Sequence, residues 1–165
     1  MQRMIRAFEK INTYAGCVSG VCICCAALLI ILEILIRSAT RYSLYITDEY
    51  TGYLMAVSSI LGLGFVEMHH AHIRMDLIDL LEKKLPRLCR FIKLCAYLLA
   101  IIVAVYIVFV SWKLFWRSYI YQSRSTQISA TLLAIPQAFL PLGAILLAVQ
   151  YIINLYKFAS GTSKK

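Results

Sequence analysis

Charged residues are scarce in this sequence, and acids are fewer than bases. Only 15 % of its 165 residues are charged, eight of them acidic, whereas 61 % are hydrophobic. A soluble domain of this size has about a quarter of its residues charged and about half apolar. The composition therefore indicates an integral membrane protein of one compact unit, and it leaves no length for a separate soluble domain.

The patterns of common catalytic and nucleic-acid sites are also missing. No serine or histidine stands in a nucleophile–base arrangement, and Gly62 and Gly64 lie inside an apolar run rather than in a phosphate-binding loop. The 17 lysines and arginines are scattered, without the aromatic–basic patch that binds nucleic acid. We therefore expect no enzyme, no cofactor and no nucleic-acid partner.

Two clusters of metal-ligand residue types have plainer explanations. Four of the six cysteines lie in the first apolar run, where a thiol behaves as a small apolar group. His69, His70 and His72 stand near Glu67 and Asp76, but ligand types that are adjacent in sequence point several ways round a helix. We interpret this second cluster as a polar turn at the membrane surface and predict no metal site.

Four long apolar segments dominate what is present. The first includes residues 11–32, which hold no charge, and about 20 apolar residues suffice to cross a bilayer. This run is longer than the apolar part of a cleaved signal peptide, so we expect it to be retained. The sequence predicts an all-α membrane protein with spans at residues 11–36, 49–68, 91–116 and 130–157.

The stretch between the second and third segments is amphipathic. Ile73, Leu77 and Leu81 fall on one helical face, while Arg74 and Asp76 lie off it. Such a pattern is typical of a short helix lying in a membrane interface. Of the 17 lysines and arginines, 12 lie in this loop with its flanks or near the two chain ends. The positive-inside rule then places both termini and this interfacial helix in the cytoplasm.

Several polar and small residues are candidates for contacts. Glu33 and Arg37 are spaced to form an ion pair at the end of the first span. Gln137 and Gln150 are polar groups in the fourth span that can hydrogen-bond to another helix. Small residues and prolines mark candidate helix-packing positions, which are Gly52, Ala56, Ser59, Gly62, Pro136 and Pro141.

The order of four local motifs resembles that of one transporter family. Residues 33–37 (EILIR) resemble an E-x-x-x-R motif that closes the first span, and Asp48 with Glu49 resembles an acidic pair that opens the second. Residues 72–76 (HIRMD) resemble an H-[IV]-R-[VI]-D motif, and Pro136 and Pro141 resemble a proline-containing start of the fourth span. Together they resemble the small membrane subunit (Q or DctQ type) of tripartite ATP-independent periplasmic (TRAP) transporters.

This resemblance implies a function and partners. The chain is expected to brace a large membrane subunit of M type, which carries the sodium and substrate sites, in a bacterial or archaeal cytoplasmic membrane. A periplasmic binding protein delivers an organic acid, and an ion gradient, usually of sodium, drives import. We expect a cytoplasmic structural motif at His72, Arg74 and Asp76, and an outer docking surface at Arg41, Asp48, Glu49 and Arg124.

Three other functions are compatible with a small apolar bundle. A self-assembling transporter or channel would conduct alone, and the spans carry too few midplane polar groups to favour it. A membrane-anchor subunit of a respiratory complex would need haem-ligating histidines inside its spans, but all three lie together at a span end. A thiol–quinone oxidoreductase would need cysteines at the outer face, where the sequence has none.

Overall fold

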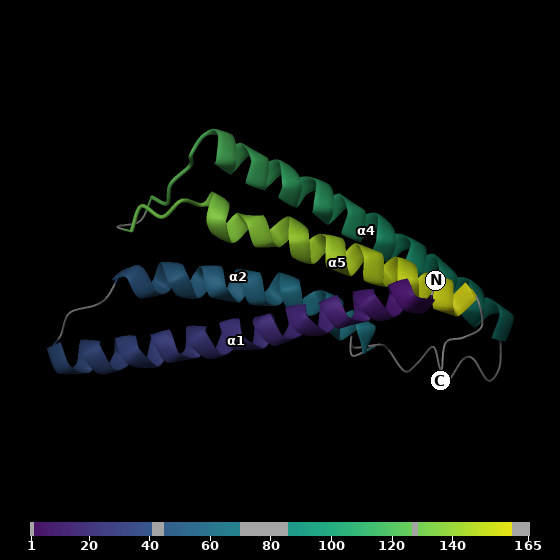
Figure 1. Ribbon diagram of the computed structural model, residues 1–165, viewed down its shortest axis with the longest axis horizontal. Helices are drawn as coiled ribbons and strands as arrows, with labels where there is room; N and C mark the ends of the chain where they lie inside the picture. The colour runs from purple at the N-terminus through teal and green to yellow at the C-terminus, as the bar shows by residue number, and fades with distance from the viewer. Residues whose placement is uncertain (1, 41–44, 70–85, 127–128, 160–165) are drawn as a thin grey trace.

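The computed structural model describes residues 2–40, 45–69, 86–126 and 129–159. Within these ranges the chain forms four helices and no strand, in agreement with the predicted all-α class (Figure 1). All four are long and apolar enough to cross a membrane. They are α1 (Gln2–Thr40), α2 (Tyr45–Met68), α4 (Pro86–Ile120) and α5 (Ala134–Ala159).

Two of the helices are longer than a bilayer requires. At 1.5 Å per residue, the 39 residues of α1 extend for about 58 Å and the 35 residues of α4 for about 52 Å. Because the hydrocarbon core is about 30 Å thick, both helices must tilt or project from it. Their ends therefore lie beyond the expected spans of residues 11–36 and 91–116. The interfacial helix expected near residues 73–85 lies outside the described residues.

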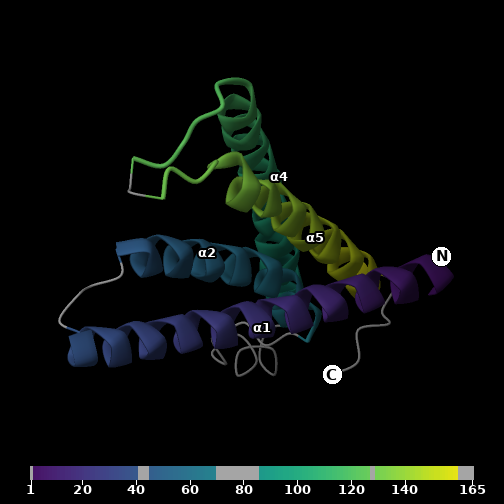
Figure 2. The same cartoon turned by 60° about the vertical axis from the view of Figure 1, so that its left-hand side comes forward.

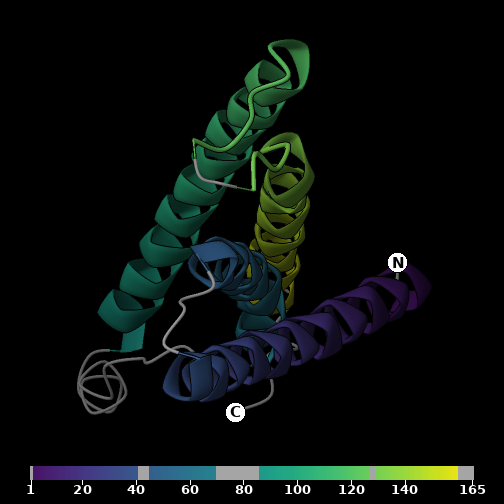
Figure 3. The ribbon, with the colours of Figure 1, turned by 90° about the vertical axis from the view of Figure 1, so that its left-hand side faces the viewer.

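The helices are arranged as a row rather than as a closed bundle. α1 packs along α2, α2 packs beside α5, and α5 packs along α4 (Figure 1). Figure 2 shows α4 steeply inclined to the α1–α2 pair, and Figure 3 shows α1 and α4 inclined to each other. Among the described helices α4 contacts α5 alone. The first residues of α1 and the last of α5 lie at the same end of the molecule.

The two prolines of the last helix occupy different environments. Pro136 is half-buried in the first turn of α5, where a backbone N–H has no intrahelical partner to lose. Pro141 lies inside the helix and is buried. Of the two, Pro141 alone is placed where a proline removes an intrahelical hydrogen bond.

Glycine allows α2 and α5 to approach closely. A Cβ atom built on Gly143 would lie 2.8 Å from the backbone carbonyl carbon and oxygen of Ile60 on α2. A backbone cannot move aside as a side-chain tip can, so this contact requires glycine. Small residues at such crossings provide the van der Waals contact that holds helices together in lipid.

Replacing Gly143 with alanine is expected to push α5 away from α2. Overpacking of this kind lowers the free energy of unfolding by about 1–3 kcal/mol. Thermal unfolding of the purified chain in detergent, followed by circular dichroism, would measure the effect. Gly52→Ala is the matched control, because a Cβ at Gly52 meets no atom within 4 Å. Equal unfolding temperatures for the two variants would contradict the close contact.

Candidate partner and docking surfaces

A chain of buried side-chain hydrogen bonds joins three helices near the end that holds the termini. Asn12 Nδ2 of α1 donates to Gln150 Oε1 of α5 at 2.8 Å, and Gln150 Nε2 donates to Asn154 Oδ1 at 3.1 Å. Asn154 Nδ2 then donates to Glu67 Oε1 of α2 at 2.8 Å. All four side chains are at most 3 % exposed. We call this set the polar chain.

The donors of the polar chain all point the same way. Each of the three amides donates toward Glu67, and Gln150 and Asn154 each accept from the residue before them, so the carboxylate is the terminal acceptor. Hydrogen bonds aligned in this manner polarise and strengthen one another in a low-dielectric interior. Glu67 therefore determines the direction of the whole chain, and a donor in its place would oppose every bond in it.

The other end of the polar chain abuts a glycine. Asn12 Oδ1 is buried and has no hydrogen-bond partner among the residues that the structure describes. A Cβ built on Gly64 of α2 would lie 2.9 Å from this oxygen. The oxygen thus lies close to the position that a Cβ atom on Gly64 would occupy. Gly64 leaves the space that Asn12 needs to reach Gln150.

Two further polar contacts link α1 to its neighbours. Lys157 Nζ of α5 forms an ion pair with Glu9 Oε1 of α1 at 2.7 Å, one turn before Asn12. Ser19 and Ser58 join α1 to α2 reciprocally, since each hydroxyl donates to the other residue's backbone oxygen, at 2.8 and 3.0 Å. These contacts fix α1 against both α5 and α2.

A second cluster lies at the opposite end, where α2 begins. Glu49 is buried, with 7 % of its surface exposed. Its carboxylate accepts hydrogen bonds from the Tyr53 hydroxyl at 2.6 Å and from the Ser129 hydroxyl. Ser129 also lies 2.8 Å from the Thr131 hydroxyl. Glu49 therefore ties the connection between α4 and α5 to the start of α2.

This connection has a hairpin-like backbone. Ser125 N donates to Thr131 O at 2.9 Å, and Leu133 N donates to Ser123 O at 3.0 Å, around an isolated antiparallel bridge. Gln122, where α4 ends, and Ala130, inside the loop beyond the bridge, have positive φ angles of 46° and 47°. We call residues 122–133 the outer hairpin, of which residues 127 and 128 lie outside the described part.

Comparison with known proteins identifies the family. The model of the family described as "Tripartite ATP-independent periplasmic transporters, DctQ component" matches residues 26–161. That range covers most of the chain. The chain belongs to the DctQ family.

It is therefore a small membrane component of a TRAP transporter, as the motifs indicated, and it is a multi-pass membrane protein. Neither the curated proteins nor the solved structures gave a match. The family is one of transporter components rather than of enzymes.

The predicted docking residues of this DctQ chain do not all face outward. Asp48 and Arg124 are exposed, and both lie at the end of the molecule that carries the outer hairpin. Glu49 is turned inward and holds the hairpin, so its carboxylate is not presented to a docking protein. Arg41 lies outside the described residues.

The predicted packing residues of α2 separate into two faces. Gly62 faces α1, where a Cβ would lie 3.0 Å from Ser19 Oγ. Gly52, Ala56 and Ser59 are exposed, and they share one helical face at spacings of four and three residues. The first face packs against α1 within this DctQ chain, and the second is exposed.

The remaining predicted sites are placed as follows. Glu33 is half-buried and Arg37 is exposed, one turn apart on α1. His72, Arg74 and Asp76 lie outside the described residues, so the cytoplasmic motif stays a prediction. Gln150 does hydrogen-bond to another helix, as the sequence indicated.

Sequence reasoning did not find Asn12 or assign Glu67 to a helix–helix contact. A signal was present, because an amide and a carboxylate at the ends of apolar spans are costly in a membrane unless they are paired. What the sequence did not supply was the neighbour of each helix.

Replacing Gln150 with leucine removes the central link of the polar chain and leaves Asn12 Nδ2 buried without its acceptor. We expect the free energy of unfolding to fall by about 1–2 kcal/mol. Unfolding by sodium dodecyl sulfate in mixed micelles would measure it. Gln137→Leu on the same helix is the control, because the buried Gln137 Oε1 has no hydrogen-bond partner. A smaller loss for Gln150→Leu than for the control would contradict the role of the polar chain.

Proposed function

We propose that this chain is the static scaffold subunit of a TRAP transporter that imports an organic acid. In this proposal it braces a large M-type subunit, which carries the substrate and the driving ion, and sodium is that ion. A periplasmic binding protein delivers the substrate. The complex lies in the cytoplasmic membrane of a bacterium or an archaeon.

The observation that carries the scaffold role is the use of the buried polar groups. In the polar chain, the serine pair and the Glu49 cluster, polar side chains bond to another helix or to the outer hairpin. A transport site would instead direct polar groups and broken helices toward a substrate near the bilayer midplane. Polar groups engaged in this way stabilise the positions of the helices, which is what a scaffold requires.

The orientation follows from the charge distribution. Most lysines and arginines lie on the side of the termini, so we propose that this side is cytoplasmic. The polar chain and the Glu9–Lys157 pair then lie near the inner surface. The outer hairpin, with Arg124 exposed at its base, lies on the side from which a binding protein approaches.

We assign the contact with the large subunit to the exposed small-residue face of α2. Gly52, Ala56 and Ser59 would let a partner helix approach the α2 backbone closely, as small residues do at helix interfaces in lipid. The space around Gly52 is open, with no atom within 4 Å of a Cβ position. α2 is also in the middle of the row, held by both α1 and α5. A partner helix packed on α2 would therefore contact a helix that α1 and α5 already hold in position.

Replacing Gly52 with leucine would fill that space and separate the two subunits. With an affinity tag on this chain and extraction in mild detergent, we expect the yield of the co-purified large subunit to fall at least fivefold. The amount of the tagged chain should not change, because a Cβ at this position meets no atom of the described residues within 4 Å.

Gly20→Leu on α1 is the matched control, since Gly20 also has open space around it. Loss of the partner in Gly20→Leu but not in Gly52→Leu would move the interface to α1 and contradict the assignment to α2. Recovery of the unmodified chain as a homo-oligomer without a large subunit would contradict the scaffold role itself.

Docking of the binding protein is assigned to the outer hairpin and the adjoining start of α2. Arg124 and Asp48 present exposed charges there, and Glu49 holds the hairpin in place. Opposite charges on a docking surface mainly raise the rate of encounter and fix orientation. A defect in them should therefore depend on the concentration of the binding protein.

Replacing Arg124 with glutamate is expected to lower uptake severalfold at a low concentration of binding protein, with recovery at saturating concentration. Uptake of radiolabelled substrate into proteoliposomes that contain the whole transporter would measure this. Lys113→Glu, an exposed charge within α4, is the control. Equal uptake by the Arg124 variant and the unmodified transporter over the full concentration range would rule out docking at this residue.

A further inference from the structure

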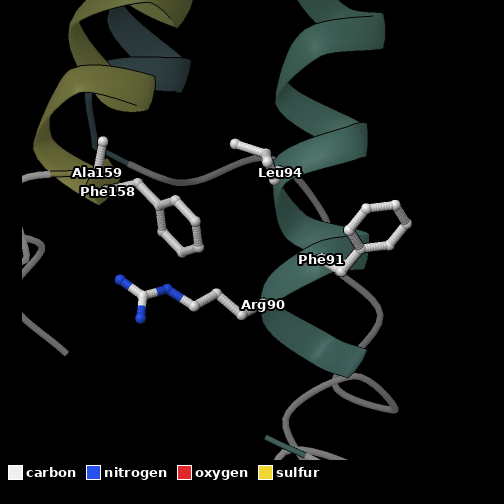
Figure 4. Close-up of a pocket in the computed structure, with 5 residues that line it drawn as sticks. All are labelled: Arg90, Phe91, Leu94, Phe158 and Ala159. Atoms are coloured by element: carbon white, nitrogen blue, oxygen red, sulfur yellow. The ribbon is translucent and has the colours of Figure 1, made fainter. Parts of the chain in front are cut away.

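A cleft lies between the start of α4 and the end of α5. It has a volume of about 330 Å³ and is lined by Arg90, Phe91, Leu94, Phe158 and Ala159 (Figure 4). This end of the molecule is the one that holds the first residues of α1 and the last of α5. The cleft is distinct from the polar chain and from the α2 face, since none of its lining residues belongs to either.

The walls of the cleft are apolar and partly fixed. The Phe158 ring lies against the Tyr97 ring of α4, with 5.8 Å between their centroids, so its position is supported from one side. Leu94 points from α4 toward Phe158, whereas the Phe91 ring projects from the other side of α4 (Figure 4). Phe91 is 63 % exposed and Leu94 is 37 % exposed. An apolar ligand can therefore contact both helices at once.

Arg90 is the one cation among the residues that line the cleft. Arg90 extends from α4 toward α5, beside the Phe158 ring (Figure 4). Within the described residues it has no hydrogen-bond or ion-pair partner, whereas Lys157 on the neighbouring helix is paired with Glu9. The guanidinium group thus presents five N–H donors in a planar fork that suits phosphate oxygens.

The cleft lies at the ends of two membrane-spanning helices, where the lipid head groups are expected. Arg90 lies one turn after the start of α4 at Pro86, and Ala159 is the last residue of α5. Arginine side chains near helix ends reach the head-group region while their stems stay in apolar surroundings. From Arg90 the apolar wall continues along α4 through Leu94 toward Tyr97, into the span. A lipid could therefore place its charged head group at Arg90 and its apolar tail along the wall that leads into the span.

We propose that this cleft binds one anionic phospholipid. Its phosphate pairs with Arg90, and part of an acyl chain packs between Leu94 and Phe158. A volume of about 330 Å³ is at the small end of ligand pockets and is too small for a helix about 10 Å across. The Arg90 charge, which none of the other described residues pairs, favours a lipid with net negative charge over a zwitterionic one, whose ammonium group offsets its phosphate.

Native mass spectrometry of the full chain, purified with whatever large subunit accompanies it, tests the proposal. The probes are phosphatidylglycerol and phosphatidylcholine with identical acyl chains, added to the detergent-solubilised protein. We expect one phosphatidylglycerol per chain to be retained more tightly than phosphatidylcholine. Arg90→Gln should weaken its binding about fivefold, which corresponds to the roughly 1 kcal/mol that one basic residue contributes near an anionic surface.

Two controls separate the site from general attraction to anionic lipid. Arg117→Gln removes an exposed arginine at the other end of α4 and should leave the retained lipid unchanged. Leu94→Trp fills the cleft while Arg90 remains, and it should also release the lipid. Leu99→Trp, on an exposed part of the same helix, should not.

Other occupants would give different results. Equal retention of the two lipids, or an Arg90→Gln variant that binds like the unmodified chain, would overturn the proposal. Displacement of the lipid by millimolar inorganic phosphate would indicate a simple anion site and contradict a lipid site. A large subunit that excludes phosphatidylglycerol when it co-purifies, with the lipid bound only in its absence, would show that the cleft is a protein interface. A cleft covered by the chain's own residues would retain neither lipid.

Discussion

The polar chain from Asn12 to Glu67 is the interaction on which the arrangement of the helices depends most. Lipid tails are as apolar as leucine, so burial of apolar side chains does not by itself hold membrane helices together. α1 and α5 touch only over a short stretch, and there the described contacts between them include the Asn12–Gln150 hydrogen bond and the Glu9–Lys157 ion pair. Glu67 then joins α2 to the same chain. The Glu67 carboxylate at one end of the polar chain fixes the direction of its hydrogen bonds, and Gly64 at the other end leaves room for Asn12.

The same logic operates at the opposite end of the molecule with different residues. Glu49 accepts hydrogen bonds from Tyr53 on its own helix and from Ser129 in the outer hairpin. One buried carboxylate on α2 thus anchors each end of the fold, and both reach toward α5 or the connection that precedes it. α2 is therefore the helix that connects the two ends of the fold. A scaffold that must stay still while a partner moves benefits from supports at both membrane surfaces.

The sequence predicted the elements better than it predicted their partners. Long uncharged runs sufficed for the four spans, because crossing a bilayer imposes a length and a composition on each helix separately. Gln150 was anticipated to hydrogen-bond to another helix, but its partner Asn12 was not, since the pairing depends on which helices are neighbours. Asp48 and Glu49 are adjacent in sequence and equal in charge, yet one is exposed and the other buried. Consecutive residues on a helix point about 100° apart, and the phase is fixed only by tertiary packing.

The dependence of α4 on α5 alone has a consequence for biosynthesis. α1 and α2 are made in succession and can pair as soon as both are in the membrane. α4 is made before the one described helix that it contacts, so it must wait in lipid as a solitary span until α5 emerges from the ribosome. An isolated helix in lipid has no neighbour to pair with a charged side chain, and residues 94–112 of α4 hold no charge. Of the four described helices, α5 is therefore the one that completes the arrangement, because it joins the α1–α2 pair to α4.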